Sequence, residues 1–399
     1  MPRKFKNIYH LFVAILATVF FRYPAKNLIV IGVTGTDGKT TTVNLIYEML
    51  KNAGKKVAMI SSVGAKIGGK DYDLPFHVTT PSPWQLQKFI RLAVDRGDKY
   101  LVLEVTSHGL DQNRVFGCNF KIGVITNVTH EHLDYHKTYE NYVMTKAKLF
   151  KGVEWAIINK DDKSFDNLKF EIRKLKITKI LSYGLEQGDI TLSKFLFHTP
   201  LPGKYNQQNC LAAIATCKTL GINDDKIRET LAGFKGVLGR FDFLKTNRDF
   251  RVMIDFAHTP NALEQVLSTI RPDISGKIIH VFGCAGLRDK EKRPIMGEIA
   301  AKYDDIIILT EEDYRTEDNS QIMCEIEKGV IQNRKFMMGN AIIYKISDRQ
   351  DAINKAISLA QKDDLLILTG KGHEKSLCRG TNENPWSDYV AVNKALSQL

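Results

Sequence analysis

A short apolar run followed directly by a glycine-rich turn is the feature that most restricts how this chain can fold. Residues 28–31 are wholly apolar and rich in β-branched side chains, as expected of a strand buried on both faces. The turn covers residues 32–40, and apolar residues then recur at helical spacing over 41–51. A strand, a glycine turn and a helix in this order open a βαβ unit, which predicts a parallel sheet covered by helices.

The same alternation of apolar strands and helices continues along the chain. Strand candidates recur at 57–60, 101–103, 122–125 and 155–158, and a helical stretch such as 83–96 separates several of them. Beyond residue 240 a second series begins, with strand candidates at 252–254, 278–282, 306–309 and 365–368. We therefore predict an α/β protein with three parts: an N-terminal helical segment (1–27), a P-loop central domain with a mainly parallel sheet (28–240), and a smaller Rossmann-like C-terminal α/β domain (241–399).

The first 27 residues imitate a signal peptide, because residues 1–6 are basic and residues 11–21 are apolar. The apolar run is shorter than the roughly 20 residues that span a bilayer, and no small-residue cleavage site follows it. We favour a helix packed on the central domain. A membrane-surface or partner contact through residues 8–21 and an export signal are the alternatives.

Charge and cysteine usage narrow the class of partner. The net charge is +12, but the Lys and Arg residues form no long basic run, which favours small anionic substrates over nucleic acid. The six cysteines include no CxxC pair, which is typical of reduced thiols in a cytoplasmic protein rather than of a zinc site or a disulfide framework.

The glycine turn has the residues that triphosphate binding requires. Gly35 and Gly38 allow backbone N–H groups to turn toward phosphates, and the next helix adds a favourable dipole. Lys39 would meet the β- and γ-phosphate oxygens and Thr40 could ligate Mg²⁺. Val33 stands where the usual motif has its first glycine, so this turn is a variant of the motif. The remaining predicted ATP contacts in this turn are Thr36, Asp37 and Thr41.

Acidic and imidazole side chains follow two later strands. Glu104 ends an apolar run, and a carboxylate at that edge of a parallel sheet faces the ligand side and suits Mg²⁺. Residues 126–136 contain three histidines and two acids. From these residues alone, zinc bound by His132 with His130 or His136 and a purely structural role both remain open.

The turn at 35–42, Gly-Thr-Asp-Gly-Lys-Thr-Thr-Thr, resembles the nucleotide loop of the Mur ligases, the amide-forming enzymes of peptidoglycan precursor synthesis. The resemblance extends over about residues 28–388 and is strongest to the tripeptide-ligase branch. It implies an ADP-forming ligase that uses ATP and Mg²⁺ and proceeds through an acyl-phosphate. The expected substrates are a UDP-N-acetylmuramoyl-dipeptide-like acceptor and a diamino acid, meso-diaminopimelate or L-lysine.

The family's motifs also imply roles for single residues of the central domain. Glu104 and His132 would bind Mg²⁺, and Lys146, in the stretch 142–150, would be carbamylated and act as an oxygen ligand of the metal. Glu131 stands where the family usually has Asp. The implied acceptor contacts are Thr79, Thr80, Ser107, Gln112 and Arg114, and the implied nucleotide contacts are Asn127, Asn206 and Asn209.

The second half carries further matches. Arg240 would meet the γ-phosphate and counts, with Lys39, His132 and Lys146, among the catalytic residues, while Asp255 and His258 would contact the nucleoside. Residues 312–315 read Glu-Asp-Tyr-Arg where diaminopimelate-specific relatives have Asp-Asn-Pro-Arg, which leaves the choice of diamino acid open. The implied contacts to the amino acid are Arg288, Asp313, Arg315, Gly370 and Glu374.

One departure from the family concerns the acceptor. The usual tripeptide ligase has a further N-terminal domain that grips the UDP group, whereas here the segment 1–24 precedes the loop strand. An acceptor without UDP, such as a lipid-linked one, is therefore a hypothesis. The rival functions are a folylpolyglutamate or poly-γ-glutamate type ligase and a non-catalytic ATP-binding module.

Overall fold

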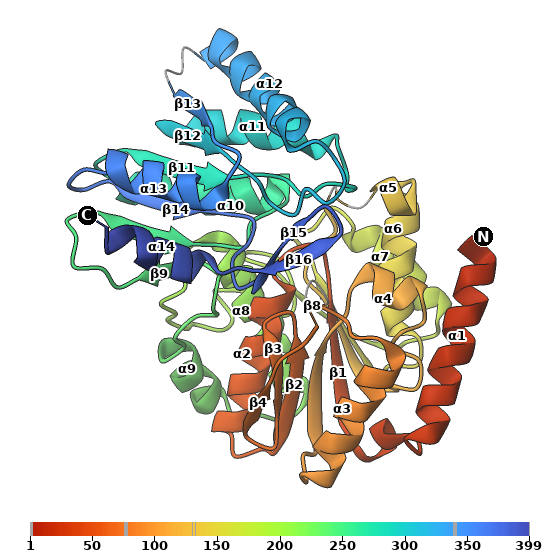
Figure 1. Cartoon of the computed structure of the whole chain (residues 1–399). Helices are drawn as coiled ribbons and strands as arrows, with labels where there is room; N and C mark the ends of the chain where they lie inside the picture. Colours follow the sequence, from red (N-terminus) through yellow and green to blue (C-terminus); the bar gives the residue numbers. More distant parts are fainter. Residues whose placement is uncertain (1–2, 76–78, 130, 132, 338–340, 399) are drawn as a thin grey trace. The chain divides into compact units, whose positions relative to one another are not determined.

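The computed structural model describes residues 3–75, 79–129, 131, 133–337 and 341–398 (Figure 1). The chain divides into two compact units, Met1–Lys235 and Gly236–Leu399. The division falls before residue 236, whereas the sequence analysis places the boundary after residue 240. The loop before residue 240 belongs to the second unit because the Gly239 N–H donates to the hydroxyl of Tyr389 at 2.8 Å.

An eight-stranded sheet forms the centre of the first unit, in the order β4-β3-β2-β5-β1-β6-β7-β8. Neighbouring strands pair in parallel over the part β2-β5-β1-β6-β7-β8. At one edge, β3 pairs antiparallel with β2, and β4 pairs antiparallel with β3. This confirms the mainly parallel sheet that the sequence predicts. The strands are β1 (Ile29–Thr34), β2 (Val57–Ser61), β3 (Gly64–Ile67), β4 (Lys70–Tyr72), β5 (Tyr100–Glu104), β6 (Phe120–Ile125), β7 (Trp155–Asn159) and β8 (Lys179–Tyr183).

Helices follow most of these strands, and several begin at the residues that favour helix starts. Ser82 caps the helix 83–95 by accepting from the Gln85 N–H, and Thr106 caps the helix 107–111 by accepting from the Gly109 N–H. The helical segments are α1 (Arg3–Phe20), η1 (Pro24–Asn27), α2 (Lys39–Asn52), α3 (Pro83–Asp95), α4 (Ser107–Asp111), α5 (Leu133–His136), α6 (Tyr139–Ala147), η2 (Lys148–Phe150), α7 (Phe165–Lys174), α8 (Lys204–Thr219) and α9 (Asp224–Ala232).

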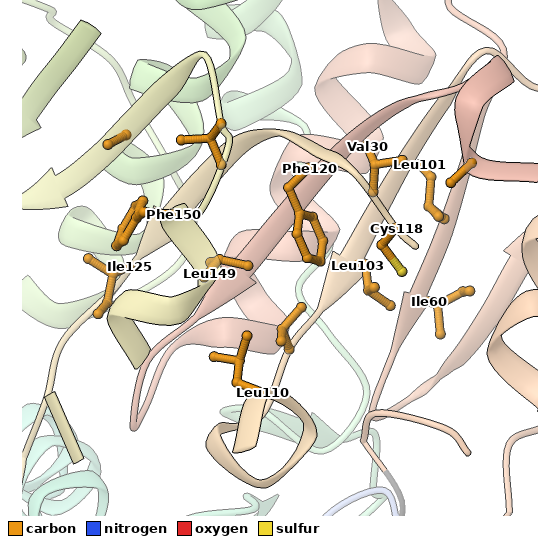
Figure 2. Close-up of a cluster of buried hydrophobic side chains, with 14 of the residues drawn as sticks. Val30, Ile60, Leu101, Leu103, Leu110, Cys118, Phe120, Ile125, Leu149 and Phe150 are labelled. Atoms are coloured by element: carbon orange, nitrogen blue, oxygen red, sulfur yellow. The ribbon is translucent and has the colours of Figure 1, made fainter. Parts of the chain in front are cut away.

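The core of this unit is built from the apolar strands and the helices that cover them. Figure 2 shows part of it, with side chains of β1, β5 and β6 beside those of η2. Gly32 lies inside β1, and a side chain there would place its Cβ 2.7 Å from atoms of Phe120 and Leu149. Gly32 is therefore required by the packing of β1 and does not replace the first glycine of the usual nucleotide-binding motif.

Helix α1 lies on the edge of this unit (Figure 1) and packs against α3. Its inner side presents small residues, since Ala14, Ala17 and Thr18 are at most 1 % exposed. The Thr18 hydroxyl is 3.2 Å from the carbonyl oxygen of Phe116, and the Asn7 side chain donates to Asp111 at 3.1 Å. These contacts agree with the predicted helix packed on the domain. In the part of the chain that the structure describes, no helix combines the length and apolarity needed to cross a bilayer.

The second unit contains a six-stranded sheet in the order β13-β12-β11-β14-β10-β9, parallel except for β9 at one edge. Two separate apolar clusters cover its two faces, which is the layering of a doubly wound α/β domain. The strands are β9 (Asp242–Leu244), β10 (Arg251–Ile254), β11 (Ile278–Phe282), β12 (Ile306–Leu309), β13 (Ile342–Lys345), β14 (Leu365–Leu368) and the hairpin β15 (Ser376–Arg379) with β16 (Asn382–Pro385). The helical segments are α10 (Pro260–Ile270), η3 (Arg271–Asp273), α11 (Lys292–Tyr303), α12 (Asn319–Met337), α13 (Arg349–Leu359) and α14 (Asp388–Leu396).

Candidate active site

The glycine turn connects β1 to α2 and has two positions that only glycine fits. Gly38 adopts φ 80°, and a Cβ on it would lie 2.2 Å from the Asn209 side-chain oxygen. A Cβ on Gly35 would lie 1.8 Å from the hydroxyl oxygen of Thr126. Both glycines therefore let neighbouring polar side chains approach the backbone of the turn closely. The turn leads directly into α2, and the N-terminal end of a helix favours an anion.

At the start of α2, a hydroxyl and a carboxylate meet. The Thr40 hydroxyl donates to a carboxylate oxygen of Glu104 at 3.1 Å and lies 2.9 Å from the Ser62 hydroxyl. The second carboxylate oxygen of Glu104 accepts from the Ser62 N–H at 3.0 Å. Glu104 is 2 % exposed, so its orientation is held by these two neighbours. Ser62, which the sequence analysis did not single out, follows β2, next to β5 in the sheet.

The end of β6 fixes the other side of the turn. The Thr126 hydroxyl donates to the Asp37 carbonyl at 2.6 Å, and the Asn127 side-chain oxygen accepts from the Asp37 N–H at 2.9 Å. The Thr36 N–H donates to the Asn127 carbonyl at 2.9 Å. The side chain of Lys39 donates to the Thr36 carbonyl at 2.6 Å, so its ammonium also stays within the turn.

Lys146 lies beneath the turn in a nearly dry environment. Its side chain is buried and donates to the Gly35 carbonyl at 2.6 Å, and its Nζ lies 4.4 Å from the ring centre of Tyr142. Burial, together with the nearby Lys39 ammonium, holds the pKa of Lys146 well below its usual value. The shift favours the neutral amine, which is the form that can react with carbon dioxide.

The predicted metal ligands are only partly within the described residues. His130 and His132 lie outside them. His136 is buried, and its Nε2 forms a 3.0 Å hydrogen bond with the Ser107 hydroxyl. Among the residues that the structure describes, no group of three or more His, Cys, Asp and Glu side chains has the arrangement of a metal site. Mg²⁺ in nucleotide sites typically needs only one or two carboxylates, with phosphate and water oxygens completing its shell. The oxygens of Thr40 and Glu104 fit that requirement.

Helix α8 brings two predicted nucleotide residues to the start of α2. The side chain of Asn209 donates to Asn206 at 3.2 Å, and the Asn209 oxygen is 3.5 Å from the hydroxyl of Thr42. Asn206 in turn donates to the Pro202 carbonyl at 2.8 Å. The pair thus lies against the glycine turn, although it comes from a distant part of the sequence.

Three of the five predicted acceptor residues, Thr80, Gln112 and Arg114, form a hydrogen-bonded group beside Glu104. The Thr80 hydroxyl donates to the Glu104 carbonyl at 3.2 Å, and Arg114 donates to the Thr80 carbonyl at 2.9 Å and to Gln112 at 2.9 Å. Burial lowers the pKa of Arg114, but a guanidinium remains charged at neutral pH. Ser107 lies at the start of α4, directly after this strand, and Thr79 is half-buried next to Thr80. The cluster is polar and basic, as a carboxylate substrate requires.

In the second unit, Arg240 lies among aromatic rings. Its guanidinium carbon is 4.4 Å from the ring centre of Phe256, and one of its nitrogens lies 3.2 Å from His373. The Phe256 ring also contacts the ring of His258 at 4.5 Å between centres. Asp255 accepts from the Phe241 N–H at 2.6 Å, and burial raises its pKa although Arg240 opposes the shift. The structure thus groups three predicted residues, Arg240, Asp255 and His258, with His373, which the sequence analysis did not assign.

The loops after β11, β12 and β14 carry the residues predicted for the amino acid. Lys371 is buried and donates to Asp313 at 2.9 Å and to Glu374 at 2.5 Å. Asp313 also accepts from the Cys378 N–H at 2.9 Å. Arg315 donates to the Gly286 carbonyl at 2.8 Å, whereas Arg288 is exposed on the loop after β11. The structure therefore joins Asp313 to Glu374 through Lys371, a link that the sequence analysis missed, and Arg315 lies 3.3 Å from the Asp313 carbonyl oxygen.

Glu312 is the unusual acid of this group. It is 7 % exposed, and its Oε2 is buried without a hydrogen-bond partner within the described residues. The same oxygen would be 2.8 Å from a Cβ on Gly370, so that glycine admits the carboxylate. Burial, with a contribution from Asp313, raises the pKa of Glu312 to about 7.

The glycine turn between β1 and α2, with Thr40 paired to Glu104, has the arrangement of a P-loop nucleotide-binding site. Comparison with known proteins then identifies the family. Residues 33–217 match the Mur ligase middle domain, and residues 239–372 match the Mur ligase, glutamate ligase domain. The chain belongs to the Mur ligase family, whose members are ATP-dependent amide ligases. This confirms the predicted family, fold class and enzyme class.

The similar proteins include several ligases of one specificity. UDP-N-acetylmuramoyl-L-alanyl-D-glutamate–2,6-diaminopimelate ligase 1 of Clostridium acetobutylicum is 37 % identical over 404 residues, which cover 97 % of this chain and 82 % of that protein. The corresponding ligase of Clostridioides difficile is 38 % identical over 406 residues, with 96 % and 82 % covered.

Solved structures agree on the fold. A UDP-N-acetylmuramoyl-L-alanyl-D-glutamate–2,6-diaminopimelate ligase matches with a TM-score of 0.59 at 31 % identity and covers 93 % of this chain and 78 % of its own. The folylpolyglutamate synthase of Mycobacterium tuberculosis has a TM-score of 0.73 at 16 % identity, with 90 % and 91 % covered. The second likeness shows the shared fold alone, because the identity is low.

Proposed function

We propose that this protein joins a diamino acid to UDP-N-acetylmuramoyl-L-alanyl-D-glutamate, with cleavage of ATP to ADP and phosphate, in peptidoglycan precursor synthesis. The observation that carries the proposal is the identity of 35–38 % to diaminopimelate-adding ligases over nearly the whole chain. The glycine turn and the Thr40–Glu104 pair supply the local chemistry that such a reaction needs.

The reaction begins with attack of the acceptor carboxylate on the γ-phosphorus. The terminal P–O bond of ATP breaks, ADP leaves, and an acyl-phosphate forms. The amine of the diamino acid then attacks the acyl carbon, the amide bond forms, phosphate leaves, and the amine loses one proton. Two anions meet in the first step, so neutralisation of charge is the main demand on the protein.

The residues of the first unit meet that demand. We assign the phosphates to the backbone of residues 35–41 and to the Lys39 ammonium, and the acceptor carboxylate to the Arg114 cluster. Thr40 and Glu104, with His132, would hold Mg²⁺, which when bound supplies positive charge beside the phosphates. We assign Asn127, Asn206 and Asn209 of this unit to the nucleotide, together with Arg240, Asp255 and His258 of the second unit.

Lys146 is proposed to be carbamylated. Its amine is buried, and burial lowers its pKa and so favours the neutral, nucleophilic form. Addition of carbon dioxide forms an N–C bond and releases one proton, and the product is an anion with two oxygens. That anion would replace a neutral amine by an oxygen ligand for the metal.

The identity of the diamino acid rests on the loops of the second unit. We assign the amino acid to Arg288, Asp313, Arg315, Gly370 and Glu374, with meso-diaminopimelate ahead of L-lysine because the similar ligases use 2,6-diaminopimelate. Lys371 forms an ion pair with both Asp313 and Glu374, so one ammonium holds the two acids together and offsets one of their two negative charges.

We further propose a cytoplasmic location, which fits six free cysteines and the need for ATP, and a contact of residues 8–21 with a membrane surface. The rival functions have less support. The folylpolyglutamate synthase likeness concerns the fold alone, and a non-catalytic ATP module would have no need of the loops around Lys371.

The test is ADP release by the purified chain with ATP, MgCl₂ and the muramoyl-dipeptide acceptor, while diamino acids are supplied one at a time. We expect ADP release and a tripeptide product with meso-diaminopimelate and slower turnover with L-lysine. Lys39→Ala should abolish both. If no acid and amine pair supports ADP release by a folded chain, the proposal is wrong, and full turnover with folate acceptors would favour the rival ligase.

A further inference from the structure

The outward side of α1 is a continuous apolar surface. The side chains at positions 8, 9, 12, 15, 16, 19 and 20 recur at the spacing of one helix face. All of them are large and apolar, and they are 37–68 % exposed. We call this set the α1 stripe; it consists of Ile8, Tyr9, Phe12, Ile15, Leu16, Val19 and Phe20.

The orientation of α1 is the reverse of an ordinary surface helix. Small side chains such as Ala14 and Ala17 face the domain, and the large apolar ones face away from it. The same inner side carries Thr18, whose hydroxyl lies 3.2 Å from the Phe116 carbonyl oxygen. Exposed apolar patches of this extent mark an interaction site in a soluble domain.

Aromatic residues extend the stripe at its C-terminal end. Trp84 of α3 is 42 % exposed, and its ring centre lies 5.3 Å from that of Phe20. Tyr23 is 40 % exposed and lies beneath the Lys26 ammonium at 4.7 Å. Trp and Tyr rings combine an apolar body with a polar tip, which suits the boundary between headgroups and acyl chains.

Charge identifies the partner. The first acidic residue of the chain is Asp37, so residues 1–36 carry five basic residues and no acid. Lys6 lies at one end of the stripe, and Arg22 and Lys26 lie at the other; all three are exposed. A second copy docked on this face would bring the same cations together, which opposes self-association. An anionic surface is the complement of a basic, aromatic-rich amphipathic helix.

We propose that the α1 stripe docks the protein on an anionic lipid surface, with α1 lying in the interface and Lys6, Arg22 and Lys26 at headgroup level. This deepens the membrane contact of the proposed function and does not depend on the ligase chemistry. Substrate would then be turned over at the membrane surface on which the protein is held.

The test uses flotation of the full chain with two kinds of vesicle, phosphatidylcholine alone and phosphatidylcholine with one quarter phosphatidylglycerol. We expect flotation with the anionic vesicles only. The variant Phe12→Asp/Leu16→Asp should reduce partitioning at least tenfold. Its matched control is Phe170→Asp/Leu196→Asp, which changes the net charge by the same amount. These two side chains lie outside α1 and are 60 % and 73 % exposed. The control variant should float as the unchanged chain does.

The electrostatic part has its own variant, Lys6→Gln/Arg22→Gln/Lys26→Gln. Each lost cation should weaken binding roughly fivefold at low salt, and high salt should weaken the unchanged chain in the same way. Equal flotation with both vesicles would overturn the choice of an anionic surface. Absence of flotation would overturn docking altogether. A concentration-dependent dimer that Phe12→Asp/Leu16→Asp abolishes, without flotation, would assign the stripe to a second copy.

Two controls separate this inference from the proposed ligase. ADP release in solution should be unchanged in Phe12→Asp/Leu16→Asp, which also shows that the variant folds. If that variant does not fold, quenching of Trp84 emission by brominated lipid in the unchanged chain decides the matter, with Trp84→Phe as the reference. A chain that floats but releases no ADP would contradict the proposed ligase and leave the docking surface intact.

Discussion

The hydroxyl of Thr40 donates a 3.1 Å hydrogen bond to the carboxylate of Glu104, which lies 64 residues further along the chain. Thr40 is in the first turn of the helix after β1, and Glu104 is the last residue of β5, the neighbour of β1 in the sheet. Parallel pairing of the two strands is what brings both oxygens to one edge. This pair is the part of the site on which the proposed magnesium dependence rests.

We expect Glu104→Gln to raise the MgCl₂ concentration needed for half-maximal ADP release by at least roughly tenfold, because one anionic oxygen ligand becomes a neutral amide. The amide oxygen can still accept from the Ser62 N–H, so the fold should persist. The control is Glu48→Gln, which removes one carboxylate charge from α2, the helix that carries Thr40. An unchanged magnesium requirement would remove Glu104 from the metal site.

Lys146 gives a second prediction. Lys146→Arg should lose ligase activity, since a guanidinium keeps its charge and cannot form a carbamate. The exposed Lys148, which pairs with Asp111 at 3.1 Å, provides the control Lys148→Arg. Labelling with ¹³C-bicarbonate should produce a carbamate resonance in the unchanged chain and in the Lys148 variant. A resonance that persists in Lys146→Arg would assign the modification elsewhere.

The buried Glu312 predicts a dependence of stability on pH. Its pKa in the folded chain is about 7, above the usual value of 4.5 for the carboxyl, so the folded state binds the proton more tightly than the unfolded one. The free energy of unfolding should therefore fall as pH rises from about 4.5 to about 7 and then level off. The difference between these two pKa values corresponds to a change in the free energy of unfolding of about 3 kcal/mol at most.

Urea unfolding at pH 5 and pH 8 measures this effect. Glu312→Gln cannot ionise, so it should be more stable than the unchanged chain at pH 8 and similar to it at pH 5. Asp363→Asn, at an exposed position in the same unit, should leave the pH dependence unchanged. If Glu312→Gln shows the same fall in stability between the two pH values, another group is responsible.

The glycine turn gives the fourth prediction. Gly35→Ala places a Cβ 1.8 Å from the Thr126 hydroxyl, so the turn must move. We expect a loss of at least about 2 kcal/mol in stability and loss of ATP binding, measured by urea unfolding and by calorimetric titration with ATP. At Gly233 the nearest atom to a new Cβ is 3.5 Å away, and Gly233→Ala should be nearly neutral in both measurements.

The apolar central strands could be predicted because each is a continuous run of buried residues, such as 278–282 and 365–368, that needs no partner to be recognised. The edge strands were missed for the opposite reason. β4 has three residues, two of them exposed, and β3 alternates between buried and half-buried positions. Their pairing, rather than their composition, makes them strands.

The site divides in the same way. The local order of strand, glycines, Lys39 and Thr40 is enough by itself to predict a phosphate-binding turn, because backbone conformation and helix start are properties of neighbouring residues. The sequence also led to the family, through motifs in a fixed order. Only the tertiary structure decided that Ser62 orients Glu104, that Lys146 lies beneath Gly35, and that Lys371 joins Asp313 to Glu374. These contacts depend on which strands are neighbours in each sheet, and no local pattern specifies that order.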